Sequence, residues 1–193
     1  MFRSVATALS LLLTLSGCIT CGSSASPSAH GTPYGGKPQA IPGLIEAEHY
    51  NEGKPGEAYY DVDEVNHGAD YRGVTQVDIE QRPDASNGFG IGWIRAGEWV
   101  AYTVKIEKSG TYSVEFPVAS QKKGGIFHLE VDGKDVSGPL QIPDTGAWTK
   151  LEMIRADNVN LKAGERVLKM VMDTNGDSGG IGDIDYMKFT LAK

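Results

Sequence analysis

Two carboxylates in the first apolar segment of the chain after its N-terminal region could hold a metal ion. Glu46 and Glu48 are separated only by Ala47, within a stretch where apolar and polar residues alternate. Alternation of this kind predicts a β-strand, in which residues two apart project from the same face. Two neighbouring carboxylates offer hard oxygen ligands, which suit calcium better than zinc or copper.

Aromatic residues between glycines could supply a second kind of chemistry. They occupy residues 92–94 (Gly-Trp-Ile) and 97–102 (Gly-Glu-Trp-Val-Ala-Tyr). A sugar ring has apolar C–H faces, so exposed aromatic side chains can bind it by stacking. Most aromatic residues of a β-protein fill its core instead, and we expect this of Trp99, Tyr102, Tyr112, Phe116, Phe127, Tyr186 and Phe189.

The sequence contains no arrangement typical of an enzyme. Glycoside hydrolysis needs two carboxylates that flank the scissile bond, and the metal interpretation already accounts for Glu46 and Glu48. The four histidines do not have the spacing of a catalytic triad or a known metal motif. We therefore predict a protein without catalytic activity.

Short alternating segments must position these side chains. They span residues 44–48, 90–94, 99–106, 112–119, 126–131, 150–155, 166–172 and 184–190, with Gly, Pro, Asn and Asp between them. Strands at this spacing, with turn residues between them and no convincing helix, indicate an antiparallel sandwich or barrel. The fold class is predicted to be all-β.

The N-terminal region divides into two parts before this domain. Residues 1–17 have a positive charge followed by a short apolar run, which is typical of a signal peptide. Residues 15–18 (Leu-Ser-Gly-Cys) resemble a bacterial lipobox, which implies lipidation of Cys18. The alternative is an ordinary secretory signal with an incidental cysteine. Residues 18–40 are rich in Gly, Ser, Pro and Ala, which predicts a flexible tether. The domain is then expected over residues 41–193.

Cysteine content and net charge narrow the possibilities further. The only two cysteines are Cys18 and Cys21, so lipidation of Cys18 would leave no intramolecular disulfide, and we assign no role to Cys21. The formal net charge is −7, and no run of Lys or Arg is present. Because nucleic-acid binding requires a basic surface, we expect no nucleic-acid partner.

Taken together, the motifs resemble those of a family 6 carbohydrate-binding module over residues 44–190. The matching segments are residues 45–50, 92–99, 110–112, 127–133, 143–148 and 184–189. This resemblance implies an antiparallel β-sandwich of the jelly-roll type, similar to galactose-binding domains. Residues 70–72 and 77–80 look like a branch of the family that occurs beside laminarinases and agarases.

The resemblance implies a structural calcium ion. The positions that match its ligands in the family are Glu46, Glu48 and Asp185, where Asp185 lies on a strand expected to adjoin the first one. Three adjacent carboxylates would repel each other without a cation or protons. The alternative is that one or more of them are surface carboxylates at strand ends.

The resemblance also implies a sugar site at the loops on one edge of the sandwich. Its matching residues are Phe89 and Trp148, facing each other, with Asp183 at the rim; the alternative for either aromatic is a core position. Phe89 stands where the family often has tyrosine, and Asp183 where many members have asparagine. A carboxylate accepts hydrogen bonds but donates none. Trp93 and Glu98 are candidates for a second site on the concave sheet face.

Together, these expectations describe an exported protein of the cell envelope, which is lipid-anchored at the outer membrane or cell surface. It would bind a polysaccharide of the β-glucan, xylan or agarose-like class, and a secreted glycoside hydrolase is a candidate partner. The alternative is a structural or adhesive surface protein that uses the sandwich to contact another protein. An exposed aromatic platform would favour sugar, whereas a buried Trp148 and a flat apolar patch would favour a protein partner.

Overall fold

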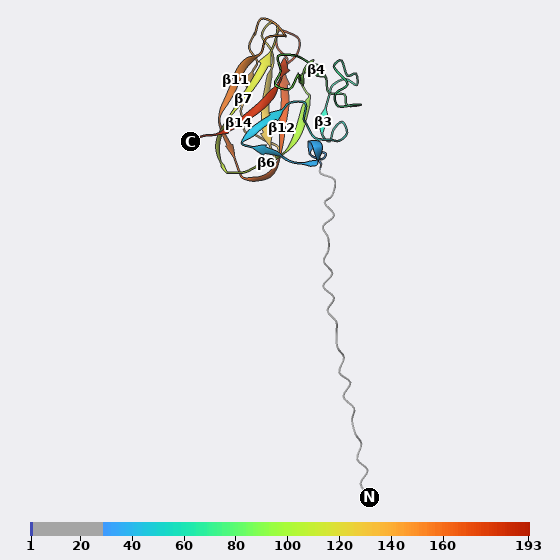
Figure 1. The fold of residues 1–193 in the computed structure, drawn as a ribbon, viewed down its shortest axis with the longest axis vertical. Coiled ribbons are helices and arrows are strands. Elements are labelled where there is room, and N and C mark those ends of the chain that lie inside the picture. Colours follow the sequence, from blue (N-terminus) through green and yellow to red (C-terminus); the bar gives the residue numbers. More distant parts are fainter. Residues whose placement is uncertain (2–28) are drawn as a thin grey trace.

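The protein folds into two β-sheets packed face to face (Figure 1). The structure, a computed structural model, describes Met1 and residues 29–193. The predicted signal peptide, Cys18, Cys21 and the first part of the predicted tether lie outside the described residues, apart from Met1. Within the described residues, no helix has the length and apolar character needed to cross a membrane. The predicted all-β fold class is confirmed.

The first sheet is built around two long antiparallel strands. Its order is β1 (Gln39–Ile41), β6 (Trp99–Ile106), β12 (Gly164–Thr174), β8 (Ile126–Val131) and β10 (Leu140–Gln141). The short strands β3 (Tyr59–Tyr60) and β9 (Lys134–Asp135) pair with β6 and β8. Only β1 runs parallel to its neighbour, β6, in this sheet.

The second sheet brings the two ends of the domain together. Its order is β2 (Gly43–Glu46), β14 (Tyr186–Leu191), β7 (Gly110–Ala119), β13 (Asp183–Ile184), β5 (Phe89–Ile91) and β4 (Ile79–Gln81), with β11 (Glu152–Leu161) on the other side of β7. Glu46 pairs with Tyr186 across β2 and β14. The expected neighbourhood of the first strand and the Asp185 region is therefore confirmed.

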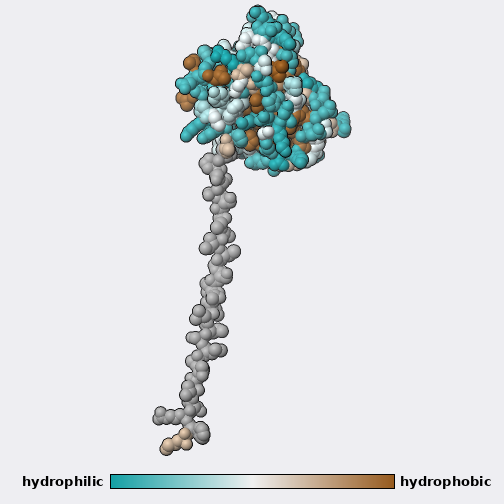
Figure 2. Space-filling view, turned by 180° about the vertical axis from the view of Figure 1, so that it is seen from behind, coloured by the Kyte–Doolittle hydropathy of each residue, from teal (hydrophilic) through white to brown (hydrophobic). Residues whose placement is uncertain are grey.

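Alternate residues of the strands form a single core between the sheets. On β7 these are Tyr112, Val114, Phe116 and Val118, and the ring of Phe116 meets that of Phe127 edge to face at 5.3 Å. Truncating a buried phenylalanine to alanine typically costs about 3–5 kcal/mol. On the outer surface shown in Figure 2, apolar residues form small separate patches among hydrophilic ones.

Two of the aromatic residues expected in the core lie on outer faces. Tyr102 and Phe189 are buried, but Trp99 and Tyr186 are only partly buried. Trp99 and Tyr102 lie three residues apart on β6, and Tyr186 and Phe189 lie three residues apart on β14. Side chains of a strand alternate between its two faces with a period of two. One member of each pair must therefore face outward, and Trp99 does so beneath the Lys169 ammonium, 3.8 Å from its ring centroid.

The N-terminal boundary of the domain differs from the expected one. Residues 29–40, assigned to the tether from composition, pack on the sandwich in the structure. Gln39 and Ala40 belong to β1, the side-chain amide of Asn51 donates a hydrogen bond to the carbonyl of His30 at 2.8 Å, and Tyr34, in a short 3₁₀ turn (η1, Tyr34–Gly36), stacks on His49 at 4.1 Å. Backbone pairing and a single aromatic stack need few apolar residues, so composition alone could not reveal this attachment.

Candidate functional site

A cleft at one end of the sandwich is flanked by two exposed tryptophans. Glu80, Trp93, Trp148 and Asp183 line a cavity of about 320 Å³. A neighbouring cavity of about 190 Å³ shares both tryptophans and Asp183, and adds Arg95 and part of the loop 178–182. We call the two together the tryptophan cleft. Trp93 is 49% exposed and Trp148 is 37% exposed, so a ligand can reach both indole rings.

Loops and strand ends place these four side chains. Trp93 follows β5, Trp148 lies between β10 and β11, Asp183 begins β13, and Glu80 is in β4. The backbone of Trp93 has a φ of 50°, in the left-handed region that costs a bulky residue about 1–3 kcal/mol. Because of this conformation, Trp93 does not continue the extended backbone of β5, which ends at Ile91.

One buried guanidinium organises the floor of the cleft. Arg82, 3% exposed, donates from Nη1 to Asp183 Oδ2 at 3.1 Å and to Glu80 Oε2 at 3.2 Å. Its Nε and Nη2 contact the two oxygens of Asp84 at 2.9 and 3.0 Å. Nη2 also donates to the main-chain carbonyl of Trp148 at 2.8 Å. Arg82 thus links the acidic floor to the loop that carries one of the two tryptophans.

The floor carries more negative than positive charge. Three carboxylates, those of Glu80, Asp84 and Asp183, share the single guanidinium of Arg82. Burial, together with the charge of Glu80, raises the pKa of Asp183 despite the opposing effect of Arg82. The pKa of Asp84, by contrast, is lowered by its hydrogen bonds to Arg82.

The cleft contains two of the three predicted sugar-binding residues. Trp148 and Asp183 lie together in it, as the resemblance implied. Phe89 does not line either cavity: it is partly buried, and its ring packs on Tyr71 at 4.3 Å. Trp93, which the sequence suggested only for the concave face, lines the cleft together with Trp148, where Phe89 was expected. The left-handed turn that brings it there has no signal in the sequence.

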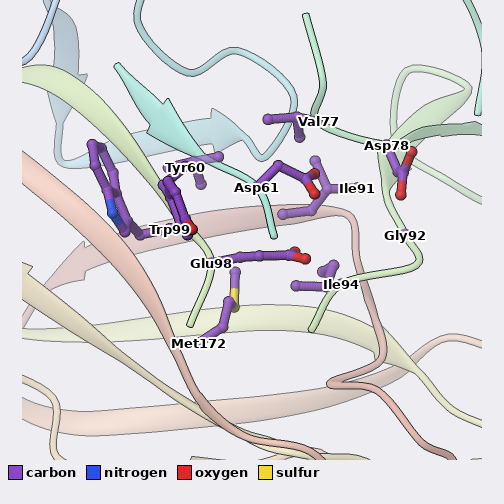
Figure 3. A pocket seen from close by; sticks show the side chains of 11 residues that line it. Tyr60, Asp61, Val77, Asp78, Ile91, Gly92, Ile94, Glu98, Trp99 and Met172 are labelled. Carbon is purple, nitrogen blue, oxygen red and sulfur yellow. The ribbon is translucent and has the colours of Figure 1, made fainter. Parts of the chain in front are cut away.

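Glu98, the other candidate for the concave face, supports the Trp93 loop from below. It faces a cavity of about 10 Å³, lined also by Asp61 and Asp78 (Figure 3). Glu98 Oε2 accepts a hydrogen bond from the main-chain N–H of Arg95 at 3.0 Å. Burial raises the pKa of Glu98 to about 7 and that of Asp61 to about 6. Its three carboxyl groups do not line the tryptophan cleft, and Glu98 is tied through Arg95 to the loop that follows Trp93.

The three predicted metal ligands meet beneath one loop. The Ser86 hydroxyl contacts Glu46 Oε2 at 2.7 Å and Asp185 Oδ1 at 3.1 Å, and the main-chain N–H of Ser86 donates to both oxygens of Asp185. The side-chain amide of Asn87 donates to Glu48 Oε1 at 2.5 Å. The structure therefore brings Glu46, Glu48 and Asp185 into one acidic cluster.

The chemistry of this cluster fits a hard cation. Glu48 is fully buried, its Oε2 has no hydrogen-bond partner, and burial raises its pKa to about 7. Burial also raises the pKa of Glu46 and of Asp185. An unpaired buried oxygen and mutually repelling carboxylates are what a cation would stabilise. In residues 29–193, however, no three His, Cys, Asp or Glu side chains already have the arrangement of a metal site.

The fold and the cleft together define a β-sandwich of the carbohydrate-binding type. The family model for carbohydrate binding module family 6 matches residues 67–191, which is more than half of the chain. The protein therefore belongs to carbohydrate binding module family 6, as the sequence motifs had implied.

Known proteins that resemble the chain include one curated relative and two solved modules. The alpha subunit of clotting factor G from Tachypleus tridentatus is 30% identical over 123 residues, which cover 63% of this chain and 16% of that protein. The module of lichenase 5A from Cellvibrio mixtus, solved with cellotriose, is 25% identical, with a TM-score of 0.58 over 79% of this chain and 99% of that one. The C-terminal family 6 module of a laminarinase from Zobellia galactanivorans is 27% identical, with a TM-score of 0.57 over 76% and 97%.

Proposed function

We propose that this protein binds a polysaccharide in the tryptophan cleft and performs no reaction on it. The observation that carries this proposal is the pair of exposed tryptophans, Trp93 and Trp148, around a cavity with carboxylates at its floor. Membership of a carbohydrate-binding family supports it. In the cleft the carboxylates are tied to Arg82, and no nucleophile stands beside a base among the residues that line it.

Binding in the cleft would combine stacking with hydrogen bonding. The indoles of Trp93 and Trp148 offer flat apolar faces to the C–H faces of a sugar ring. Asp183 and Glu80 then accept hydrogen bonds from groups at the edge of the ring. Because a sugar buries little area and keeps many polar groups, we expect dissociation constants between about 1 μM and 1 mM.

β-Glucans are the first polysaccharides to test, with xylan and agarose-like polymers after them. One solved relative comes from a lichenase and holds cellotriose, and another comes from a laminarinase. Both are modules of β-glucan-degrading enzymes by their names, which makes a secreted glycoside hydrolase a reasonable partner here too.

Calcium is proposed as a structural cofactor, held by Glu46, Glu48 and Asp185. When bound, the ion would neutralise the negative charge of these three carboxylates, two of which, Glu48 and Asp185, are buried. The protein's own residues do the rest: Ser86 and Asn87 orient the carboxylates, and the pairing of β2 with β14 brings Glu46 close to Asp185. The ion would therefore fasten the first strand of the second sheet to the last.

Attachment to the cell envelope is proposed through a lipid on Cys18, after export and removal of residues 1–17. A weak binding site becomes effective on a surface, because many copies can hold one polymer at the same time. The lipobox-like sequence before Cys18 is the support for this part of the proposal.

The alternative of an adhesive protein that contacts another protein is less favoured. Both tryptophans of the cleft are exposed and line a cavity, whereas a protein-binding face would be flatter and more continuous. On the face seen in Figure 2, apolar residues are scattered among hydrophilic ones.

Retention of the purified protein on insoluble and soluble polysaccharides, with calcium present, tests the proposal. We expect retention on one glycan class and its loss in Trp148→Ala. Trp99→Ala is the matched control, because Trp99 lies outside the cleft, and it should bind normally. A folded protein that is retained on no glycan, or a Trp148→Ala variant that still binds, would overturn the proposal.

A further inference from the structure

The excess negative charge in the tryptophan cleft points to the kind of sugar it binds. Three carboxylates around the floor, those of Glu80, Asp84 and Asp183, share one guanidinium, that of Arg82. Asp84 takes two of its hydrogen bonds, so Glu80 and Asp183 are left to share the Nη1 atom. These two carboxylates are also the ones that line the cavity.

No other cation of the described residues compensates this charge inside the larger cavity. Its lining consists of Glu80, Trp93, Trp148 and Asp183. Arg95 lines the neighbouring cavity, but its guanidinium is paired with Asp63 at 3.1 Å and its side chain is 47% exposed. A formally anionic, partly desolvated floor remains, and a positive group on the ligand would be attracted to it more strongly than in water.

The walls of the cavity favour the same kind of group. An ammonium is attracted to the face of an indole, by about 0.5–1 kcal/mol at exposed sites and more where water is excluded. Two indoles above carboxylates therefore combine the two environments that stabilise an ammonium ion. A neutral hydroxyl can donate a hydrogen bond to Asp183 but brings no charge, whereas an ammonium offers three donors and the missing charge.

We propose that the sugar unit held in the tryptophan cleft carries a free amino group, so that the ligand is a polysaccharide containing unacetylated hexosamine. This inference rests on the proposed function and specifies its ligand class. The ammonium contacts the Glu80 and Asp183 carboxyl groups from the cavity that both line, and the ring stacks on Trp93 or Trp148.

Three methyl glycosides that differ at one position provide the test. Methyl β-glucosaminide carries an ammonium at C2, its N-acetyl derivative a neutral amide, and methyl β-glucoside a hydroxyl. Each is titrated into the protein in low salt near neutral pH, while the indole N–H signals of the three tryptophans are followed by NMR. We expect the signals of Trp93 and Trp148 to shift, that of Trp99 to stay, and the glucosaminide to bind about tenfold more tightly than the other two.

Charge-neutral variants show whether the preference comes from the floor. Asp183→Asn and Glu80→Gln keep the shape of the cleft, and each should reduce the tenfold preference to about twofold or less. The preference is the ratio of two dissociation constants, so an affinity loss that the two glycosides share does not change it. Glu165→Gln removes an exposed charge far from the cleft in the first sheet and should keep the full preference. Two cleft variants are used so that a folding defect in one does not decide the result.

The outcomes separate this inference from the proposed function. If methyl β-glucoside shifts the Trp93 and Trp148 signals and the glucosaminide binds no more tightly, the amino-sugar inference is overturned and polysaccharide binding stands. The same holds if Glu165→Gln lowers the preference as much as Asp183→Asn does, since the attraction would then be non-specific. If no glycoside shifts these signals and no polysaccharide retains the protein, both proposals fail.

Discussion

The guanidinium of Arg82 donates a hydrogen bond to the main-chain carbonyl of Trp148 across 66 residues of sequence, at a distance of 2.8 Å. Through this contact a buried charge directly after β4 fixes the loop that carries Trp148 at the tryptophan cleft. The same guanidinium compensates part of the charge of Asp183 and Glu80. Arg82 is therefore a positioning residue for the cleft as well as a structural one.

Replacing Arg82 should destabilise the fold strongly. Arg82→Met would leave the buried Asp183 carboxylate without its partner, and breaking a buried ion pair in this way typically costs about 3–5 kcal/mol. Urea denaturation of the variant and of the parent protein measures the difference. Arg82→Lys keeps a charge but not the fork of donors, so we expect an intermediate loss. A loss below about 1 kcal/mol in Arg82→Met would contradict the structural role given to this residue.

The Glu98 cluster predicts that stability falls as the pH rises. Burial holds the pKa of folded Glu98 at about 7, against 4.5 for the ordinary group. Between these values the folded state retains a proton that the unfolded state has lost, so the free energy of unfolding decreases as the pH rises towards 7. The contribution of Glu98 should be about 3 kcal/mol, since one unit of pKa corresponds to about 1.4 kcal/mol. Asp61, whose pKa burial raises to about 6, acts in the same direction.

Glu98→Gln isolates the part due to Glu98. The variant cannot ionise, and its amide oxygen can still accept the hydrogen bond from the N–H of Arg95. We expect denaturant midpoints at a series of pH values from 4.5 to 8 to vary less in the variant than in the parent protein. Equal pH dependence in both proteins would show that Glu98 does not have the raised pKa.

Most of the fold could be predicted from the sequence, because strands leave a local signal. The segments expected at residues 99–106 and 126–131 match β6 and β8 to the residue. β1 was not predicted, and β11 is longer than the segment expected at residues 150–155. β1 has only three residues and forms by backbone pairing, and β11 continues to Leu161 through an irregularity between Ala156 and Val159. Neither feature depends on a run of apolar residues.

The candidate site could be predicted only in part, for a related reason. Trp148 and Asp183, whose motifs match those of a family, lie together in the cleft. Arg82 was missed, since nothing local distinguishes a buried arginine from an exposed one; its role comes from partners such as Asp183, 101 residues away. Trp93 lines the cleft and Phe89 does not, and the positive φ of Trp93, just after β5, is not readable from the sequence.

Calcium should stabilise the protein through the Glu46, Glu48 and Asp185 cluster. A ligand that binds only the folded state at 100 times its dissociation constant adds about 2.7 kcal/mol to the free energy of unfolding. We expect the melting temperature to fall on addition of a chelator and to recover with calcium. Glu48→Gln should remove most of this response, because Glu48 is fully buried and its Oε2 has no hydrogen-bond partner. Glu165→Gln, a change at an exposed position of β12 in the first sheet, is the control. A melting temperature that does not respond to chelator or calcium would rule out a stabilising calcium ion.

Trp93 and Phe89 should differ sharply in what their loss affects. Trp93 is 49% exposed and lines the cleft, so Trp93→Ala should weaken glycan binding at least tenfold, by about 1.4 kcal/mol or more, with little loss of stability. Phe89 packs on Tyr71 and against the core, so Phe89→Ala should lower the free energy of unfolding by about 2–3 kcal/mol and leave affinity nearly unchanged. Affinity measured by calorimetry and stability measured by urea denaturation on both variants give four values to compare. The opposite pattern, with affinity lost in Phe89→Ala and retained in Trp93→Ala, would return the sugar site to the position first expected from the sequence.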